Sequence, residues 1–337
     1  MGARFDRRRD ARALWIAAAL VCVGLVACFN PHPPRGAPCN DDSPCPVSQR
    51  CIDRICGGVE PGTPDAGPGE DAAVPPGEAS VPIVDLDRDT VDDSHDNCVG
   101  LANPDQGNED GDALGDACDP CPIDTSSADP DSDGVAGACD PHPTTAGDRI
   151  VAFTGFHRGV PAGWGFIGTA TQDGDSLSMT PGAMRYTSVV PEMDPIGNGT
   201  ITAELTVDSA AGPEGAAMDI SLPYDPIDDG IFCELDVPDT TKSTGHYITL
   251  WDSLEENADG GVERAVNNFA WAFGTAYRMT MTRTQTNYVC SVGPAGGGGT
   301  PQLANGSSPN TPVVSKATVA SYGANAHVQW MMVVSSP

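Results

Sequence analysis

The chain is poor in basic residues, and this limits the partners it can have. Its 337 residues contain 17 Lys and Arg against 47 Asp and Glu, which gives a formal net charge of -30 at pH 7. Nucleic acid and anionic membrane surfaces both require basic protein surface, so neither is expected to bind. Aromatic residues make up only 6% of the chain, whereas Gly and Pro occupy 39 and 31 positions. One large compact core is therefore not expected, and the length allows two or three domains.

Several catalytic motifs are also absent. The sequence contains no H-E-x-x-H and no G-x-S-x-G, and the glycine run at 296–299 lies in a low-complexity segment rather than in a phosphate-binding loop. These absences exclude the zinc protease, serine hydrolase and P-loop classes.

The N-terminus has the form of a secretory signal. An apolar run at 13–27 is too short to span a bilayer and follows five arginines, Arg4, Arg7, Arg8, Arg9 and Arg12. The sequence Leu25-Val26-Ala27-Cys28 resembles the lipobox of bacterial lipoproteins. The resemblance implies a signal peptide at 1–27, secretion across the inner membrane and a lipid anchor on Cys28. Phe29 is not the Asp associated with inner-membrane retention, which favours the outer membrane or cell surface. The alternatives are an ordinary signal peptide with an incidental Cys28, or an N-terminal membrane anchor.

The cysteine count fits an oxidising compartment. Of twelve Cys, Cys22 leaves with the signal peptide and Cys28 would carry lipid, so ten remain. Four of them lie in a Cys-rich module at 28–56, namely Cys39, Cys45, Cys51 and Cys56. Two disulfides with three possible connectivities are expected there, because the C-x2-C knuckles of the alternative zinc site are missing. The module resembles short Cys-rich modules of secreted bacterial proteins, which implies no activity. A Pro/Gly-rich linker at 57–82 follows it.

Residues 83–148 carry eighteen acidic residues and one basic residue. Three windows of twelve residues align without gaps, and they begin at Asp85, Asn108 and Asp129. Oxygen-bearing side chains recur at positions 1, 3, 5, 9 and 12 of each window, except that Gly137 stands at position 9 of the third. This register wraps a hard cation, and calcium suits it better than magnesium, which demands octahedral geometry. The expected ligands are Asp85, Asp87, Asp89, Asp93 and Asp96 in the first window, Asn108, Asp110, Asp112, Asp116 and Asp119 in the second, and Asp129, Asp131, Asp133 and Asp140 in the third.

The segments between the windows carry a more specific resemblance. Asn97-Cys98, Asn103-Pro104-Asp105-Gln106, the run 115–119 and the run 137–140 resemble thrombospondin type 3 repeats. In that family, Asp-rich loops wrap calcium ions with almost no hydrophobic core. The resemblance adds Asn103 and Asp105 as candidate ligands. It also implies disulfides between Cys98 and Cys118 and between Cys121 and Cys139.

The windows depart from the family pattern at several positions. Position 6, where the family has Gly to permit a left-handed turn, holds Thr90, Ala113 and Gly134. Val99 replaces the usual Pro, and Gly137 removes one carboxylate, so we expect fewer or weaker sites. The alternative is an acidic disordered linker, which does not explain why the Cys residues keep step with the register. We expect a calcium-dependent spacer, because without metal the segment repels itself.

The composition changes at about residue 149. Alternation places Ile201, Ala203, Leu205 and Val207 on one strand face, and likewise Ile231, Cys233, Leu235 and Val237. Further β-rich runs are expected at 247–251, 269–273, 277–283, 288–292 and 328–334. Residues 149–337 therefore predict a β-sandwich or jelly roll, with a buried disulfide between Cys233 and Cys290. Phe156 with 159–164, and the closing run 324–334, resemble the first and last strands of concanavalin-like, laminin-G-like jelly rolls.

One motif in this domain allows an enzymatic alternative. The run from Glu234 to Asp239 resembles the E-x-D-x-x-E motif of family 16 glycoside hydrolases, which implies catalytic roles for Glu234, Asp236 and Asp239. The final position holds Asp instead of Glu. The other interpretation is that these carboxylates are solvated strand residues. Six aromatic residues could line a groove, although aromatics in strands more often belong to the core: Trp164, Tyr224, Trp251, Trp271, Tyr277 and Trp330.

The sequence thus predicts a mainly β protein in which a disulfide knot and a core-poor, calcium-wrapped repeat array precede a β-sandwich. We expect a lipid-anchored envelope protein whose partners are calcium ions, the membrane through its lipid, and a glycan or protein ligand in adhesion. It is not expected to be an enzyme. The alternative is an envelope glycoside hydrolase acting on polysaccharide.

Overall fold

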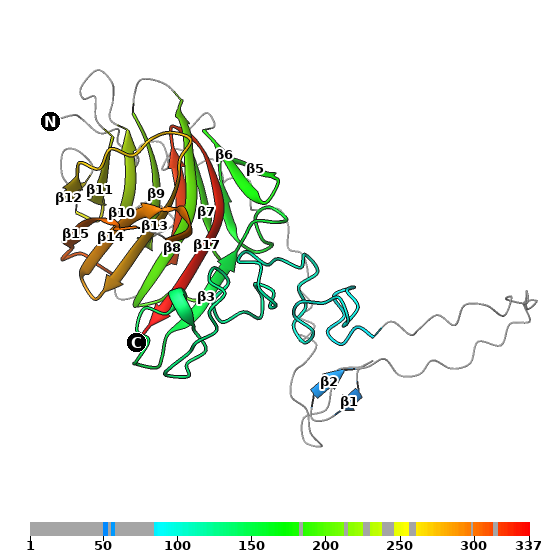
Figure 1. Ribbon diagram of the computed structural model, residues 1–337. Coiled ribbons are helices and arrows are strands. Elements are labelled where there is room, and N and C mark those ends of the chain that lie inside the picture. Colours follow the sequence, from blue (N-terminus) through cyan, green and yellow to red (C-terminus); the bar gives the residue numbers. More distant parts are fainter. Residues whose placement is uncertain are drawn as a thin grey trace, which may run out of the picture. The chain divides into compact units, whose positions relative to one another are not determined.

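The computed structural model of the chain describes residues 50–52, 55–57, 84–181, 185–211, 215–224, 230–237, 246–255, 261–297, 299–312 and 316–337 (Figure 1). The described residues fall into two compact units, one holding 84–337 and the other the strands β1 (Arg50–Ile52) and β2 (Ile55–Gly57). These two strands pair antiparallel, with Cys51 opposite Cys56. The predicted signal peptide, Cys28, Cys39, Cys45 and residues 58–82 of the linker lie outside the described residues.

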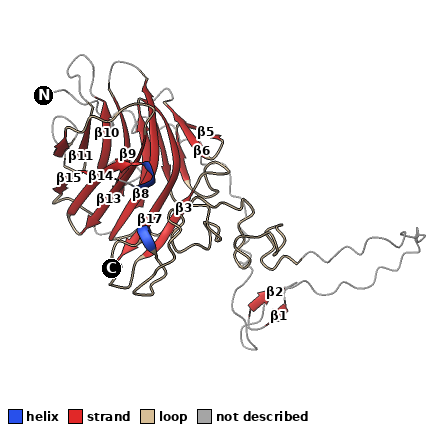
Figure 2. Ribbon diagram, viewed as in Figure 1, coloured by secondary structure: helices blue, strands red, loops and turns tan. Residues whose placement is uncertain are grey.

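Residues 149–337 form two antiparallel sheets, as predicted (Figure 2). The seven-stranded sheet contains, in order, β12 (Val262–Asn267), β11 (Tyr247–Asp252), β10 (Gly230–Val237), β9 (Ala216–Tyr224), β16 (Lys316–Tyr322), β7 (Tyr186–Val190) and β4 (Gly165–Ile167). The eight-stranded sheet contains β15 (Gln302–Ser307), β14 (Asn287–Pro294), β13 (Ala276–Thr284), β8 (Asn198–Ala210), β17 (Ala324–Ser336), β6 (Ser176–Thr180) and β5 (Thr169–Asp173), and β3 (Arg149–Thr154) pairs with β17. The described residues contain no α-helix, only the 3-10 turns η1 (Gly137–Cys139) and η2 (Ala295–Gly297).

The core lies between the two sheets and follows the predicted alternation. Ile201, Ala203 and Leu205 of β8 are fully buried, as are Cys233 and Leu235 of β10. The disulfide between Cys233 and Cys290 joins β10 of one sheet to β14 of the other, and it is the pair expected from the sequence. The main core therefore consists mostly of aliphatic and Met side chains from both inner faces, together with a few aromatic rings such as Phe156 and Tyr288, and it contains the disulfide between the sheets.

Two predicted strands are wrong. The run 269–273 is not a strand. Its aromatic side chains pack edge to face, Trp271 against Phe273 and Phe269 against Tyr277, so packing of rings explains the alternation that suggested a strand. The run 156–164 is a turn with a single bridge between His157 and Gly159, and the opening strand is β3. In the part of the chain described here, no helix is long and apolar enough to cross a bilayer.

Candidate metal centres and their contacts with the sandwich

The acidic segment folds as three loops that share one hydrogen-bonding scheme. In each loop the side chain at position 1 accepts a hydrogen bond from the backbone N–H at position 4. The donors are Arg88, Gly111 and Ser132, at 2.6, 2.8 and 2.7 Å. The backbone N–H at position 9 donates to the carbonyl just before the loop, at 2.8, 2.9 and 3.1 Å in the three loops. The twelve-residue register read from the sequence is therefore a structural repeat.

Carboxylates converge inside each loop. One oxygen from each member of three groups lies within 4.8 Å of the others, and the groups are Asp85, Asp87 and Asp89; Asp110, Asp112 and Asp119; and Asp129, Asp131 and Asp133. All three combine side chains of one twelve-residue window, as the register requires.

Several carboxylates of the three windows have buried oxygens without a hydrogen-bond partner, all at positions 3 and 12. They are Oδ2 of Asp87, Asp96, Asp110 and Asp140, and both side-chain oxygens of Asp131. A buried carboxylate oxygen without a donor is costly. Desolvation is the largest cause of a raised pKa at Asp87, Asp119 and Asp140, and neighbouring carboxylates add to it. An oxygen-only cage with unmet negative charge fits a hard divalent cation.

The backbone of the loops is left-handed at position 4, and in the first and third loops also at position 6. Position 4 has φ 66° at Arg88, 74° at Gly111 and 63° at Ser132, and nothing in the sequence of the loops indicates this turn. At position 6, Thr90 adopts φ 83° without being Gly. Its N–H donates to the same Asp85 side chain that accepts from Arg88, at 3.1 Å, and this hydrogen bond offsets the steric cost.

The local backbone explains why Gly137 stands at position 9 of the third loop, where the other two loops have a carboxylate. Its φ is +55°, and an added Cβ would lie 2.8 Å from the carbonyl oxygen of Ser126. In the other two loops the position 9 carboxylates, Asp93 and Asp116, accept from the backbone N–H at position 2, at 2.8 Å each. The third loop therefore lacks one oxygen and one internal hydrogen bond.

The expected disulfides between the repeats are present, Cys98 to Cys118 and Cys121 to Cys139. The two additional candidate ligands lie outside the carboxylate groups. Asn103 is 5% exposed and uses its polar groups inside the fold, since its N–H donates to Asp89 Oδ2 at 2.9 Å and its Nδ2 donates to Asn97 Oδ1 at 2.7 Å. Asp105 is exposed.

The third loop packs directly on the sandwich. The disulfide Cys121–Cys139 and the buried Val135 and Ala136 form a small core with Trp330, Met332 and Val334 of β17. Asp133 Oδ2 accepts from the backbone N–H groups of Gly147 and Asp148 at the start of the sandwich, at 2.9 and 2.7 Å. The backbone N–H of Val135, followed by those of Gly147 and Asp148, lowers the pKa of Asp133 against the opposing effect of burial. The segment is thus attached to the sandwich along its last repeat.

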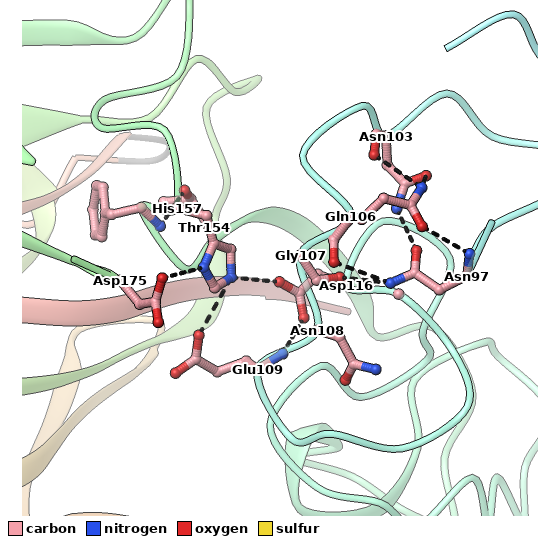
Figure 3. A network of polar contacts seen from close by, with 12 residues as sticks. Asn97, Asn103, Gln106, Gly107, Asn108, Glu109, Asp116, Thr154, His157 and Asp175 are labelled. Atoms are coloured by element: carbon pink, nitrogen blue, oxygen red, sulfur yellow. Dashed lines mark hydrogen bonds and ion pairs between the residues drawn. The ribbon is translucent and has the colours of Figure 1, made fainter. Parts of the chain in front are cut away.

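The second loop meets the sandwich at His157 (Figure 3). His157 Nε2 lies 3.4 Å from Asp116 Oδ2 and 3.7 Å from Glu109 Oε2, and Nδ1 lies 3.7 Å from Asp175 Oδ1. Burial raises the pKa of Glu109 to about 7, with His157 opposing the shift and Asp116 adding to it. Burial also raises the pKa of Asp116.

The carboxylates of the enzymatic alternative lie together on one face of the seven-stranded sheet. Glu234 pairs with Asp219 on β9 and with Thr249 on β11, whose hydroxyl donates to Glu234 Oε2 at 2.8 Å. Asp236 is two residues along the same strand face. Glu234 is 1% exposed and Asp236 8% exposed, so the interpretation of solvated strand residues is wrong. Asp239 lies outside the described residues.

The candidate groove aromatics are mostly core residues. Trp271, Tyr277 and Trp330 are buried, and Trp164 packs against the main core. Trp251 lies opposite Phe232, on the same face as Glu234, and is 9% exposed. The side chain of Tyr224 lies outside the described part.

No protein-family model and no curated protein matches the chain. Among solved structures, it is similar to the carbohydrate-binding module CBM66 from Bacillus subtilis, with 10% identity and a TM-score of 0.38, over 50% of this chain and 92% of that one. It is similar to the Ca2+-bound exoplasmic/lumenal domain of VIP36, with 14% identity and a TM-score of 0.41, over 56% and 90%. It is also similar to the GH43 protein BlXynB from Bacillus licheniformis, with 12% identity and a TM-score of 0.41, over 55% and 39%. Similarity at this level assigns no ligand.

Proposed function

We propose that this chain is a lipid-anchored envelope protein in which a calcium-binding repeat array supports a β-sandwich displayed for adhesion, through a glycan or protein ligand. One observation carries the calcium part. Three loops of the same register aim carboxylates at a common point, and at positions 3 and 12 buried oxygens have no donor. The ligands in each loop would be the side chains at positions 1, 3, 5 and 12, joined by position 9 in the first two loops.

Calcium supplies positive charge where the chain has almost none. The acidic segment has one basic residue, Arg88, against eighteen carboxylates, and outside the third loop it has little apolar core. Metal binding therefore contributes directly to folding of this segment. The protein's own groups fix the loop backbone in advance, because the position 1 side chains and the two disulfides hold it.

Calorimetric titration of the mature chain, residues 28–337, tests the calcium proposal. We expect saturable heat from three sites, with magnesium binding far more weakly. Asp87→Asn should remove or weaken one site, whereas the matched change Asp105→Asn at an exposed position should leave all sites intact. The absence of saturable calcium binding would contradict the proposal.

A saccharide ligand is supported by the polar face of the seven-stranded sheet. Asp219, Glu234 and Thr249 are cross-strand neighbours on this face and are at most 1% exposed. The more accessible groups on the face are Asp236 and Trp251, which are 8% and 9% exposed, so these two would contact a sugar first. Carboxylates and hydroxyls accept from sugar hydroxyls, and aromatic rings offer an apolar face to a sugar ring. Screening a glycan array with the mature chain and with Trp251→Ala tests this. Retained binding by the variant would place the ligand elsewhere.

The same face supports a second candidate, a glycoside hydrolase. Glu234 and Asp236 share the face, as two cooperating carboxylates must. Hydrolysis of β-glucans that is lost in Glu234→Gln would establish this candidate. A wild-type chain that hydrolyses no β-glucan would contradict this candidate and leave glycan binding as the proposed function.

The lipid anchor has its own test. Metabolic labelling with a fatty acid should mark the wild-type chain and not Cys28→Ser, and fractionation should place the labelled chain in the outer membrane. Labelling of the Cys28→Ser variant would contradict the anchor.

A further inference from the structure

His157 is a sandwich residue held firmly in place. It follows Phe156, which is 1% exposed in the main core and adopts φ 56°, an unusual conformation for a bulky side chain. The N–H of Phe156 donates to Thr154 Oγ1 at 3.0 Å, and the carbonyl of His157 accepts from the side chain of Gln172. The next residue, Arg158, donates to the carbonyl of Pro104 in the acidic segment. The turn at 156–158 is therefore held by the sandwich on one side and contacts the acidic repeats on the other side.

Two glycines leave the space that the imidazole occupies. A Cβ at Gly107, just before the second loop, would lie 2.7 Å from Asp116 Oδ2 and 2.8 Å from His157 Cδ2. A Cβ at Gly155 would lie 2.5 Å from His157 Nε2 and 2.7 Å from Glu109 Oε2. The ring and the two carboxylates thus fit a site that any larger residue at either glycine would fill.

The two oxygens of Asp116 have different partners. Oδ1 accepts from the N–H of Glu109, which closes the second loop, and Oδ2 faces His157 Nε2 at 3.4 Å. The equivalent residue of the first loop, Asp93, also closes its loop through Leu86, but no described histidine approaches it within ion-pair distance. Of the first two loops, only the second therefore has a position 9 carboxylate that contacts a histidine of the sandwich.

We propose that His157 orients Asp116 and thereby sets the calcium affinity of the second loop, as a positioning residue outside the metal's own ligands. The inference depends on calcium binding by the loops as proposed above. Groups that orient metal ligands typically change affinity by about tenfold or more when they are removed. Because coupling is reciprocal, calcium in the second loop should also stabilise the sandwich through the same contact.

Calcium titration of the mature chain with His157→Ala tests the proposal. We expect one site to weaken about tenfold, His157→Gln to recover part of the loss, and Gly107→Ala to resemble His157→Ala. His327→Ala is the matched control, because His327 lies between the sandwich carboxylates Asp173 and Asp208 and is expected to leave every site unchanged.

Double variants identify the loop. With Asp112→Asn in the second loop, His157→Ala should have no further effect on the remaining sites, whereas with Asp87→Asn in the first loop it should keep its full effect. The calcium-induced rise in the melting temperature of the sandwich should also be smaller in His157→Ala. Unchanged affinities in His157→Ala, or equal losses in both backgrounds, would overturn the inference. A wild-type chain that binds no calcium would refute the proposed function itself.

Discussion

At the scale of single residues, the position 3 carboxylates decide whether the loops are metal sites. Asp131 is the clearest case, because both of its oxygens are buried without a partner, whereas the carboxylates at positions 1 and 5 of the same loop accept backbone hydrogen bonds. Its side chain therefore does little for the loop's own backbone and is available to a cation.

We predict that Asp131→Asn weakens calcium binding at one site by at least about tenfold. The change removes one negative charge and replaces one of the two buried side-chain oxygens of Asp131 by an NH2 group, which cannot bind a cation. Calorimetric titration measures the change, with Asp124→Asn as the control, since Asp124 lies outside the three carboxylate groups. Equal affinities for the two variants would show that the third loop holds no ion.

A pH dependence follows from Glu109 in the calcium-free chain. Its pKa is raised from 4.5 to about 7, first by burial. The protonated form is thus the one that folding favours, so the contribution to stability is full below 4.5 and disappears as the pH rises through 7. Between pH 5 and pH 8 in chelator, the wild type should lose about 1 kcal/mol more than Glu109→Gln, after allowance for solvent screening. Parallel melting curves for the two proteins would contradict this.

Some features of the loops could be predicted from the sequence and others could not. The ligand register could be predicted because it is local, and cation-binding oxygens must recur at fixed spacing. The left-handed turn at position 4 could not, because Arg88 and Ser132 are not residues that favour positive φ and only the hydrogen bond to position 1 makes the turn acceptable. His157 could not be predicted either, since it lies far from the second loop in sequence.

At the scale of elements, one face of β10 could be predicted from the sequence and the other could not. Alternation identified Cys233 and Leu235 as core residues, and they are fully buried. The opposite face, with Phe232, Glu234 and Asp236, is also buried. Burial of that face depends on the central position of β10 between β9 and β11 and on what covers the sheet, neither of which is encoded in the strand's own pattern.

The link between β10 and β14 gives a prediction at this scale. Cys233 and Cys290 are 57 residues apart, and a cross-link of that span contributes about 4 kcal/mol by restricting the unfolded chain. The double variant Cys233→Ala/Cys290→Ala should therefore unfold at much lower denaturant concentration, with calcium binding retained. Denaturation followed by Trp fluorescence measures this. An unchanged midpoint would mean that the two sheets need no covalent link.

At the scale of the whole molecule, the acidic repeats are part of the folded unit that contains the sandwich. The sequence predicted a spacer, but the third loop shares a core with β17, and the second loop contacts His157. β3 begins at Arg149, the first residue of the predicted sandwich domain, and side chains pack across this position. Such packing between segments cannot be read from composition.

We therefore predict that chelation destabilises the sandwich as well as the repeats. Without calcium, the carboxylates of the acidic segment repel each other, and the contacts of the second and third loops with the sandwich weaken. The melting temperature followed at the sandwich tryptophans should fall by several degrees or more in chelator, and calcium should restore it. A sandwich melting temperature that does not change with calcium would show that the repeats and the sandwich unfold independently.

Native mass spectrometry of the mature chain tests most directly whether each of the three loops holds a calcium ion. We predict a calcium-loaded species carrying at least three ions, and one ion fewer in each of Asp87→Asn, Asp110→Asn and Asp131→Asn. A chain whose mass in calcium equals its mass in chelator would contradict it.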